Sequence, residues 1–343
     1  MAVTKPVKDR PMRAPNRMAF TALSFLCVAI GANAQFLDPG QVPRYWTSAF
    51  PLNGFEQATI NVDEIMSGGP GRDGIRSIDA PTFTPFSQVL SDFVETEPVL
   101  SLEINGDARA YPLGILTRHE IANDIIGGVP VAVTFCPLCN SGIAYERMVN
   151  GEATEFGVSG LLRNSDMVMY DRQTETFWQQ FTGEGIVGPL AGAQLTAIPI
   201  RLESVAKFAA RHPNGLVLDP PRPGQTYKFN PYGGYDGLNR PFLYFGSLPD
   251  GIPALARVVA VEDTAWSLES LRQAGQIDAG DLRLTWTEGQ NSALDTRDIR
   301  QGKDVGNVLV QRRGEDGIYR DAVHDVTFTF TFHAFRPHGR LIY

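Results

Sequence analysis

The sequence predicts a β-rich α+β fold with two related lobes of mainly antiparallel strands and a few short helices. The first observation is the alternation of apolar and polar residues over 99–104 and again over 326–332, which is typical of strands with one buried face. The second is that helical spacing of apolar residues is confined to short stretches such as 202–212. The third is an internal resemblance between residues 110–116 and 265–271, each of which follows an alternating strand. These patterns predict a duplicated architecture in which strands outnumber helices.

Residues 1–34 have the pattern of a secretory signal peptide. Basic residues precede an apolar run over 18–30, and the small residues Ala32 and Ala34 supply a cleavage site. The run is shorter than the roughly 20 residues that span a bilayer, and no second apolar stretch follows, so no stable membrane span is expected after cleavage. Cys27 lies inside the run without the small preceding residue of a lipid-modified cysteine. We therefore expect an exported protein, periplasmic or extracellular in a bacterium.

The charge and cysteine content of the chain limit its partners. The formal net charge is −8, and removal of the basic leader leaves the rest more acidic. An acidic surface repels phosphate backbones and anionic lipid, so nucleic acid is not expected as a partner. The two cysteines outside the leader are too few for a disulfide scaffold, so stability depends on apolar burial. We expect an unknown small molecule or an envelope protein as partner, and nothing in the sequence indicates a nucleotide cofactor.

The N-terminal half of the chain begins with a segment that lacks periodicity. Residues 35–95 are rich in proline and glycine, which predicts an extended segment that lies on the body of the protein. The first β-rich lobe is expected over 96–200. Its opening strand is followed by Asn-Gly at 105–106, a strong hairpin signal between alternating runs. A proline then suits the first turn of a short helix expected over 112–119.

The C-terminal half of the chain repeats this plan after a connection over 201–250. The connection contains a short helix that Pro213 ends, and an aromatic loop at 230–236. The second β-rich lobe is expected over 251–343, and its alternating run at 326–332 is interpreted as one long strand. This lobe has no cysteine. The cysteines of the first lobe are therefore not required by the shared fold and belong to a local feature.

Cys136 and Cys139 are the residues that indicate a chemistry most directly. The spacing Cys-Pro-x-Cys after an apolar strand is typical of a metal knuckle, in which a tight turn aims both sulfur atoms at one ion. Asn140 stands where knuckles often have glycine, and asparagine tolerates the left-handed conformation next best. One knuckle supplies only two ligands, so a tetrahedral site needs others from His, Asp, Glu or Met. The sequence thus predicts a zinc or copper site in the first lobe.

Candidates for the remaining ligands lie on both sides of the knuckle in the sequence. His119 is the first, because the strand that leads to Cys136 must run back past the helix that His119 ends. Met167 and Met169 alternate in a strand-like run, and a thioether beside thiolates would favour Cu(I). A lone histidine is also common as a packing residue, and a methionine pair as core filling. The charged residues between positions 166 and 175 have two explanations: a catalytic acid and base pair, or a turn held by ion pairs. Another possible site comprises Asp166, Asp171, Arg172, Tyr232 and Tyr235.

Two other functions remain open from the sequence. A Cys-x-x-Cys pair outside the cytoplasm can carry out thiol–disulfide exchange. Such sites place the first cysteine at the start of a helix, however, whereas residues 143–146 resemble a strand. In the other alternative the two cysteines form an inert structural disulfide in a non-catalytic binding module for an envelope partner, with Tyr232, Tyr235 and Trp178 as its contact surface.

A series of short motifs occurs in a fixed order along most of the mature chain, at 74–79, 110–113, 119–124, 135–139, 159–166, 169–178 and 230–236. In sequence and order these motifs resemble a known family, the bacterial exported proteins that carry the domain of unknown function numbered 3179. The resemblance implies no established activity. It therefore assigns no catalytic role to any residue, and the chemistry has to be argued from the side chains.

Overall fold

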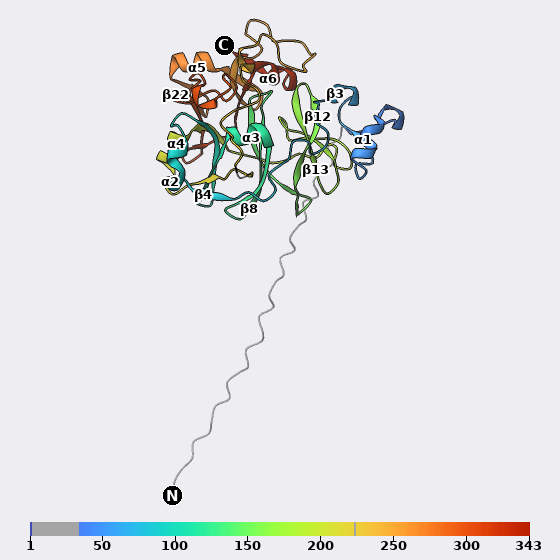
Figure 1. The fold of residues 1–343 in the computed structure, drawn as a ribbon, viewed down its shortest axis with the longest axis horizontal. Helices are drawn as coiled ribbons and strands as arrows, with labels where there is room; N and C mark the ends of the chain where they lie inside the picture. The colour runs from blue at the N-terminus through green and yellow to red at the C-terminus, as the bar shows by residue number, and fades with distance from the viewer. Residues whose placement is uncertain (2–33, 223) are drawn as a thin grey trace.

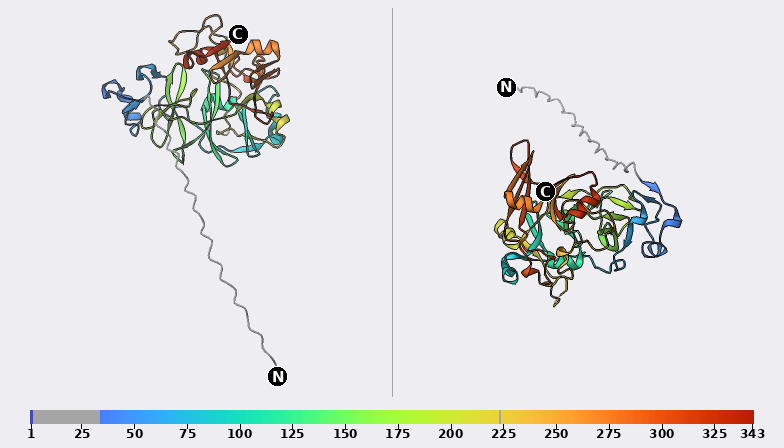
Figure 2. Two further views of the ribbon diagram at one scale, coloured as in Figure 1. Left: turned by 180° about the vertical axis from the view of Figure 1, so that it is seen from behind. Right: turned by 90° about the horizontal axis from the view of Figure 1, so that it is seen from above.

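The computed structural model describes Met1 and residues 34–222 and 224–343. The predicted signal peptide, including Cys27, lies outside the described residues except for its two ends. Among the described residues, no helix is long and apolar enough to cross a membrane. In both views of Figure 2 the blue N-terminal segment and the orange C-terminal strands lie at opposite sides of the molecule.

The fold is β-rich, with several antiparallel sheets and short helices, as the sequence predicts. The first sheet has the order β17-β5-β6-β18-β4. Its central hairpin turns at Asn105 and Gly106, whose φ angles of 52° and 83° suit the predicted Asn-Gly turn. The strands are β4 (Phe83–Pro85), β5 (Pro98–Ile104), β6 (Asp107–Pro112), β17 (Arg201–Ser204) and β18 (Leu216–Leu218).

A short helix connects this hairpin to the sheet that carries the cysteines. α3 (Leu113–His119) begins directly after Pro112, and Glu120, which has a φ of 58°, follows its last residue. The next sheet has the order β16-β9-β8-β7 and is antiparallel throughout. Its strands are β7 (Ile121–Ile126), β8 (Val129–Cys136), β9 (Ser141–Glu146) and β16 (Ala197–Ile198).

The C-terminal part of the chain reproduces this topology. The order β25-β19-β20-β26 matches β17-β5-β6-β18, and in both sheets the last of these strands pairs in parallel with its neighbour. The helix α4 (Val205–Arg211) joins β17 to β18 as α6 (Thr329–Phe335) joins β25 to β26. We call β5–β9 with β17–β18 the first repeat, and β19–β23 with β25–β26 the second repeat. The remaining elements are β19 (Arg257–Val261), β20 (Thr264–Ser267), α5 (Leu268–Ala274), β21 (Gln276–Ala279), β22 (Leu282–Thr287), β23 (Asn307–Arg313), β24 (Tyr319–Asp321), β25 (Asp325–Phe328) and β26 (Arg340–Ile342).

The long strand predicted over 326–332 is wrong in its second half. β25 ends at Phe328, and α6 begins at Thr329. Each side chain from Thr329 to Phe332 is almost fully buried, so the alternation of threonine and phenylalanine does not mark one buried face. A helix that is buried on all sides carries no amphipathic period to distinguish it from a strand.

β12–β15, which lie between β9 and β17 in the chain, form a seven-stranded antiparallel sheet with β1–β3, in the order β1-β2-β15-β14-β13-β12-β3. Residues 35–95, predicted as extended, contribute three short strands to it and also form helices. Trp46 of α1 packs on Phe177 with ring centroids 5.5 Å apart. Figure 1 shows α1 and β3 beside β12 and β13. The elements are β1 (Gln35–Phe36), α1 (Arg44–Ala49), β2 (Gln57–Ala58), β3 (Ile65–Ser67), α2 (Phe86–Val89), β12 (Phe156–Arg163), β13 (Asp166–Asp171), β14 (Phe177–Gln179) and β15 (Gly185–Val187), with a separate hairpin of β10 (Met148–Val149) and β11 (Glu152–Ala153).

The largest apolar core runs through both repeats. It contains Leu100 and Phe135 from the first repeat and Val259 and Phe328 from the second, all fully buried. Cys136 and Cys139 belong to the same core. The two repeats therefore form one body, and the cysteines lie in the region where they meet.

Candidate metal centre

The cysteine turn has the local shape that the sequence predicts. β8 ends at Cys136 and β9 begins at Ser141, so only four residues separate the two strands. The backbone N–H of Cys139 donates to the carbonyl of Cys136 at 3.2 Å, and that of Asn140 donates to the carbonyl of Pro137 at 3.2 Å. Asn140 has a φ of 51°, the left-handed conformation expected for it. Cys136 and Cys139 are free thiols, so the structural disulfide is not the arrangement in this structure.

The second repeat holds this turn in place through β25. The carbonyl of Cys139 accepts hydrogen bonds from Thr327 Oγ1 at 2.8 Å and from the backbone N–H of Phe328 at 2.9 Å. The side chain of Asn140 donates to the carbonyl of Val326 at 2.7 Å. Tyr235 donates to the carbonyl of Leu138 at 2.9 Å. A buried turn with its carbonyls satisfied in this way is fixed in one orientation.

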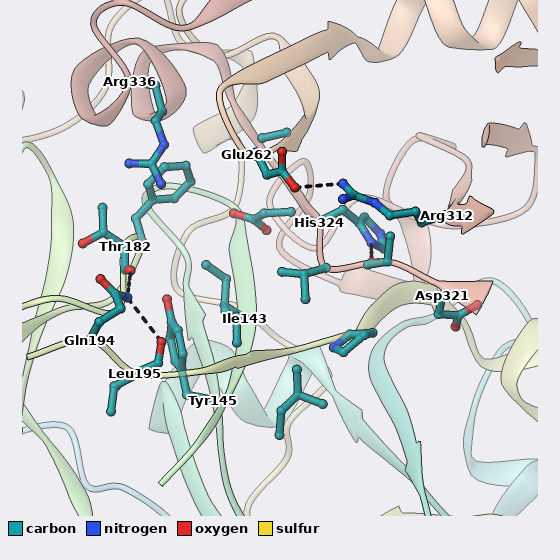
Figure 3. A pocket seen from close by; sticks show the side chains of 18 residues that line it. Ile143, Tyr145, Thr182, Gln194, Leu195, Glu262, Arg312, Asp321, His324 and Arg336 are labelled. Carbon is teal, nitrogen blue, oxygen red and sulfur yellow. Dashed lines mark hydrogen bonds and ion pairs between the residues drawn. The ribbon is translucent and has the colours of Figure 1, made fainter. Parts of the chain in front are cut away.

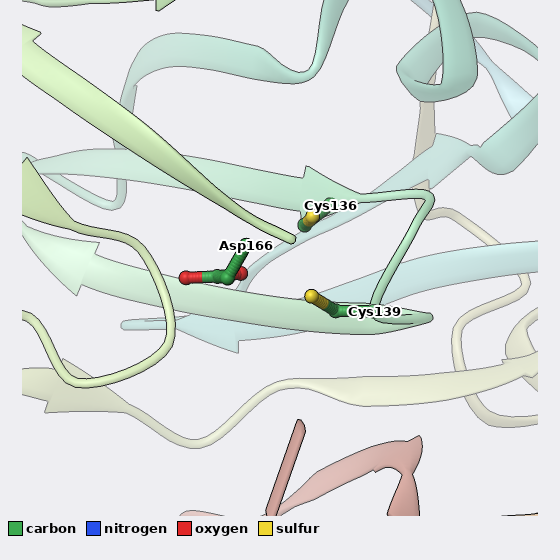
Figure 4. Close-up of side chains that lie close together, drawn as sticks. All are labelled: Cys136, Cys139 and Asp166. Atoms are coloured by element: carbon green, nitrogen blue, oxygen red, sulfur yellow. The ribbon is translucent and has the colours of Figure 1, made fainter. Parts of the chain in front are cut away.

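A third polar group, Asp166, reaches the two sulfur atoms from the hairpin between β12 and β13. Asn164 and Ser165 turn this hairpin with φ angles of 52° and 64°. One ligand atom each from Cys136, Cys139 and Asp166 lies within 4.8 Å of the other two, and all three residues are buried. Figure 4 shows the three side chains together at the end of β8.

The carboxyl of Asp166 is hydrogen-bonded on one side only. Its Oδ2 accepts from Gln179 Nε2 at 2.6 Å and from the backbone N–H of Phe181 at 3.0 Å. Among the described residues, Oδ1 has no hydrogen-bond partner although Asp166 is fully buried. Native proteins rarely leave a buried carboxyl oxygen without a partner. A cation between Oδ1 and the sulfurs would satisfy it.

The buried environment disfavours the charged forms of the three groups when no cation is present, and it keeps the two thiols protonated. Burial raises the pKa of Asp166 to about 6. Burial also raises the pKa of the Cys136 thiol, and it raises the pKa of Cys139 well above the usual range together with the neighbouring thiol. Desolvation disfavours charge, and a metal ion reverses this because it supplies the opposite charge directly. Metal binding at this site therefore requires the release of protons.

The dimensions of the group fit a tetrahedral metal ion. Zinc–sulfur bonds of about 2.3 Å place two ligand atoms of a tetrahedron roughly 3.8 Å apart. The ligand atoms lie within 4.8 Å of one another, so each pair has to approach by at most about 1 Å to reach this spacing. The described residues can therefore hold a metal ion with three protein ligands.

His119 does not join the group, contrary to the ligand set predicted from the sequence. Its Nδ1 lies 2.7 Å from the carbonyl of Arg76, and its Nε2 lies 3.1 Å from the hydroxyl of Tyr227. Burial lowers the pKa of His119. Both ring nitrogens thus have other partners, and the histidine occupies the hydrogen-bonded packing role that the sequence left open.

The two methionines lie close to the centre but differ in their surroundings. Met167 lines a small cavity of about 80 Å³ that also contacts Cys136. Met169 is fully buried and faces Trp178 across the β13–β14 pair. Met167 is therefore the thioether that shares a space with the cysteine turn, whereas Met169 contributes to the core.

Glu120 is a residue of this cavity to which the sequence analysis gave no role. It lines the same space as Cys136 and Tyr232. Burial and the nearby Asp166 raise the pKa of Glu120 to about 8. Its φ of 58° is unfavourable for a residue with a side chain and costs about 1 kcal/mol or more. The only signal in the sequence was its place in the motif at 119–124, which does not show where the carboxyl points.

The other possible site predicted from the sequence separates into structural parts. Asp171 accepts hydrogen bonds from Thr174 and from Trp178 Nε1, so it caps a turn. Arg172 forms ion pairs with Asp73 and Asp79, as expected for a turn with ion pairs. Trp178 is fully buried and offers no contact surface. Of this set, Asp166 alone belongs to the group with the cysteines.

A duplicated, strand-rich body with a buried Cys-Cys-Asp group between its repeats defines the class of this protein. The chain belongs to the family described as a protein of unknown function, DUF3179, whose model matches residues 72–339. The matched range contains the first repeat, the second repeat up to α6, and all three members of the group. No curated protein and no solved structure matches the chain.

Proposed function

We propose that this protein binds one transition-metal ion, with zinc as the first choice, through Cys136, Cys139 and Asp166. The observation that carries the proposal is that two thiols and one carboxyl group, all buried, converge within 4.8 Å. Two thiolates with a carboxylate oxygen suit zinc, whereas Cu(I) prefers soft sulfur donors. The unpartnered Oδ1 of Asp166 supports a cation at this point.

The cavity beside Cys136 supports an open fourth position at the metal. A structural zinc site is closed by four protein ligands, whereas a catalytic site keeps one position for water or substrate. Glu120 lines this cavity and carries a carboxyl group that can hold or move a proton there. Met167 lines it as well, and a thioether in the fourth position would turn the preference toward Cu(I).

Thiol–disulfide exchange is less well supported as a function. The attacking form in such exchange is the thiolate, and burial raises the pKa of both thiols here. The residue after the turn begins β9, so no helix N-terminus stabilises a thiolate at Cys136. The non-catalytic binding module is also less well supported, because Trp178, one residue of its proposed contact surface, is buried.

Export of the mature protein is part of the same proposal. It rests on the basic, apolar and small-residue pattern of residues 1–34. The mass of the protein recovered from a bacterial envelope fraction tests it, and the expected mature N-terminus is Gln35.

The metal proposal is tested with the full mature chain, stripped with a chelator and reloaded with zinc or cobalt. Elemental analysis is expected to find one equivalent of metal, and cobalt is expected to give a thiolate-to-metal charge-transfer absorption. Cys136→Ser and Cys139→Ser should lose the absorption, and Asp166→Asn should weaken binding. His119→Gln is the matched control and should keep both metal and absorption.

The same experiment separates the alternatives. Retention of copper in preference to zinc would keep the site and assign the thioether of Met167 to it. A metal-free protein whose two thiols exchange rapidly with a disulfide substrate would support redox chemistry instead. Full metal content in Cys136→Ser would contradict the proposal, because the ion would then lie elsewhere.

A further inference from the structure

A second cavity lies between the two repeats, separate from the cavity beside Cys136. Its volume is about 510 Å³, within the range of small-molecule pockets, which often occur where two structural units meet. Tyr145 and Phe181 line it from the first repeat and the seven-stranded sheet, and His324, Asp325 and Arg336 line it from the second repeat. Figure 3 shows side chains from both walls pointing into this interlobe cleft.

Asp325 supplies a buried polar group with an unused oxygen. Its Oδ1 accepts a hydrogen bond from the backbone N–H of Gly142 at 3.0 Å, which fixes the orientation of the carboxyl. Among the described residues, its Oδ2 has no hydrogen-bond partner, although the side chain is only 7% exposed. Asp325 lines the interlobe cleft but its Oδ2 is enclosed, so a ligand there meets this oxygen once the side chains around it move aside.

Arg336 supplies a cation with weak protein partners, because its one hydrogen bond runs from Nη1 to the carbonyl of the adjacent Phe335 at 3.2 Å among the described residues. Its Nε lies 3.1 Å from Asp263 Oδ1 but in an orientation that forms no hydrogen bond, and the side chain of Asp263 is 83% exposed. The other charged groups of the cleft have closer partners: Arg312 pairs with Glu262 at 2.8 Å, and Asp321 pairs with Arg201 at 2.5 Å. Figure 3 shows Arg336 directed from the end of α6 toward Thr182 and Tyr145.

His324 supplies an acceptor beside Asp325. Its Nδ1 lies 2.9 Å from the carbonyl of Ala322 and so carries the proton. Burial lowers the pKa of His324, which favours the neutral ring with a lone pair on Nε2. None of the described residues forms a hydrogen bond with Nε2. Tyr145 already donates its proton to the carbonyl of Gln180, so its hydroxyl can only accept from a ligand.

We propose that the interlobe cleft binds a small organic acid that also carries a hydrogen-bond donor, such as an amino acid or a hydroxy acid. The ligand carboxylate pairs with the guanidinium of Arg336, whose planar N–H groups match a carboxylate. The ligand amino or hydroxyl group donates to Asp325 Oδ2 and His324 Nε2. One ligand then satisfies the three polar groups that the protein leaves without strong partners in this cavity.

The test uses isothermal titration calorimetry and thermal shift on the full mature chain with L-alanine and L-malate as probes. Propionate lacks the donor group and alaninamide lacks the carboxylate, so both should bind at least tenfold more weakly than L-alanine. Arg336→Gln should weaken L-alanine and L-malate about tenfold or more, as expected for a lost charged hydrogen bond. Arg340→Gln is the matched control, because it removes the same charge from an exposed position outside the cleft.

A second variant guards against misfolding of the first. Asp325→Asn keeps an oxygen to accept from Gly142 but presents N–H groups to the ligand, so it should reduce the preference for L-alanine over propionate. Circular dichroism of each variant establishes that it is folded. The inference is overturned if neither L-alanine nor L-malate binds at 10 mM, if alaninamide binds as well as L-alanine, or if Arg336→Gln behaves like Arg340→Gln. Binding of L-alanine and L-malate should persist in Cys136→Ser, so this proposal and the metal proposal can fail independently of each other.

Discussion

Replacement of Asp166 by asparagine should stabilise the metal-free protein while it weakens metal binding. Burial raises the pKa of Asp166 from 3.8 to about 6. Because the unfolded chain releases this proton more easily, the carboxyl contributes stability that is fully present below about pH 4 and is lost as the pH rises through about 6. The shift of about 2 pH units corresponds to about 3 kcal/mol at 1.36 kcal/mol per unit.

Asparagine fits the hydrogen bonds that Asp166 makes. Both donors, Gln179 Nε2 and the backbone N–H of Phe181, bond to the single oxygen Oδ2, which the asparagine carbonyl can replace. The amide NH₂ then takes the position of Oδ1, which has no partner among the described residues. We therefore expect the free energy of unfolding at pH 8 to rise by up to about 3 kcal/mol, and its decline between pH 4 and 6 to flatten.

Urea denaturation of chelator-treated protein between pH 4 and 8, followed by tryptophan fluorescence, measures this change. Asp171→Asn is the control, because that carboxyl accepts from several donors and its loss should destabilise the turn without affecting metal binding. A metal-free Asp166→Asn protein that is less stable than the unsubstituted protein at pH 8 would refute the electrostatic reasoning. Unchanged zinc affinity in the same variant would refute the ligand assignment.

Three further predictions concern neighbouring residues. His119→Gln should leave metal content unchanged by elemental analysis and lower the free energy of unfolding by about 1–2 kcal/mol, because the hydrogen bonds to Arg76 and Tyr227 are disturbed. Thr327→Val should lower the free energy of unfolding by about 1 kcal/mol in urea denaturation, because the carbonyl of Cys139 loses one of its two hydrogen-bond donors. The same variant should weaken zinc binding about tenfold or more in a chelator competition. Asp325→Asn should raise the melting temperature in scanning calorimetry more at pH 8 than at pH 4. Burial raises the pKa of Asp325 to about 7, so the carboxyl destabilises the fold as the pH rises from about 4 to about 7.

The features predicted best from the sequence depend on residues that are adjacent in the chain. The hairpin at Asn105, the left-handed Asn140 and the tight turn between the cysteines follow from local backbone preferences. The duplication was also visible, because β6 with α3 and β20 with α5 keep similar residues in the same order. The second repeat joins β22 to β23 through the long stretch 288–306 in place of the cysteine turn, in agreement with a feature local to the first repeat.

The features that the sequence did not predict depend on packing between distant segments. Asp166 was named only within another possible site, because no local pattern indicates that the β12–β13 hairpin brings it beside β8. His119 lies near the cysteines in sequence, but its ring turns to Arg76 and Tyr227. The helix over 329–335 was hidden because its threonines and phenylalanines are buried all round, so periodicity carried no information.

The hold of β25 on the cysteine turn has a consequence for the order of events during biosynthesis. Residues 325–328 anchor a turn that was synthesised almost two hundred residues earlier. The centre cannot reach its final geometry until β25 has been synthesised and is available for folding. Capture of an ion then follows the synthesis of β25, and a chain truncated before residue 325 should be unable to retain one.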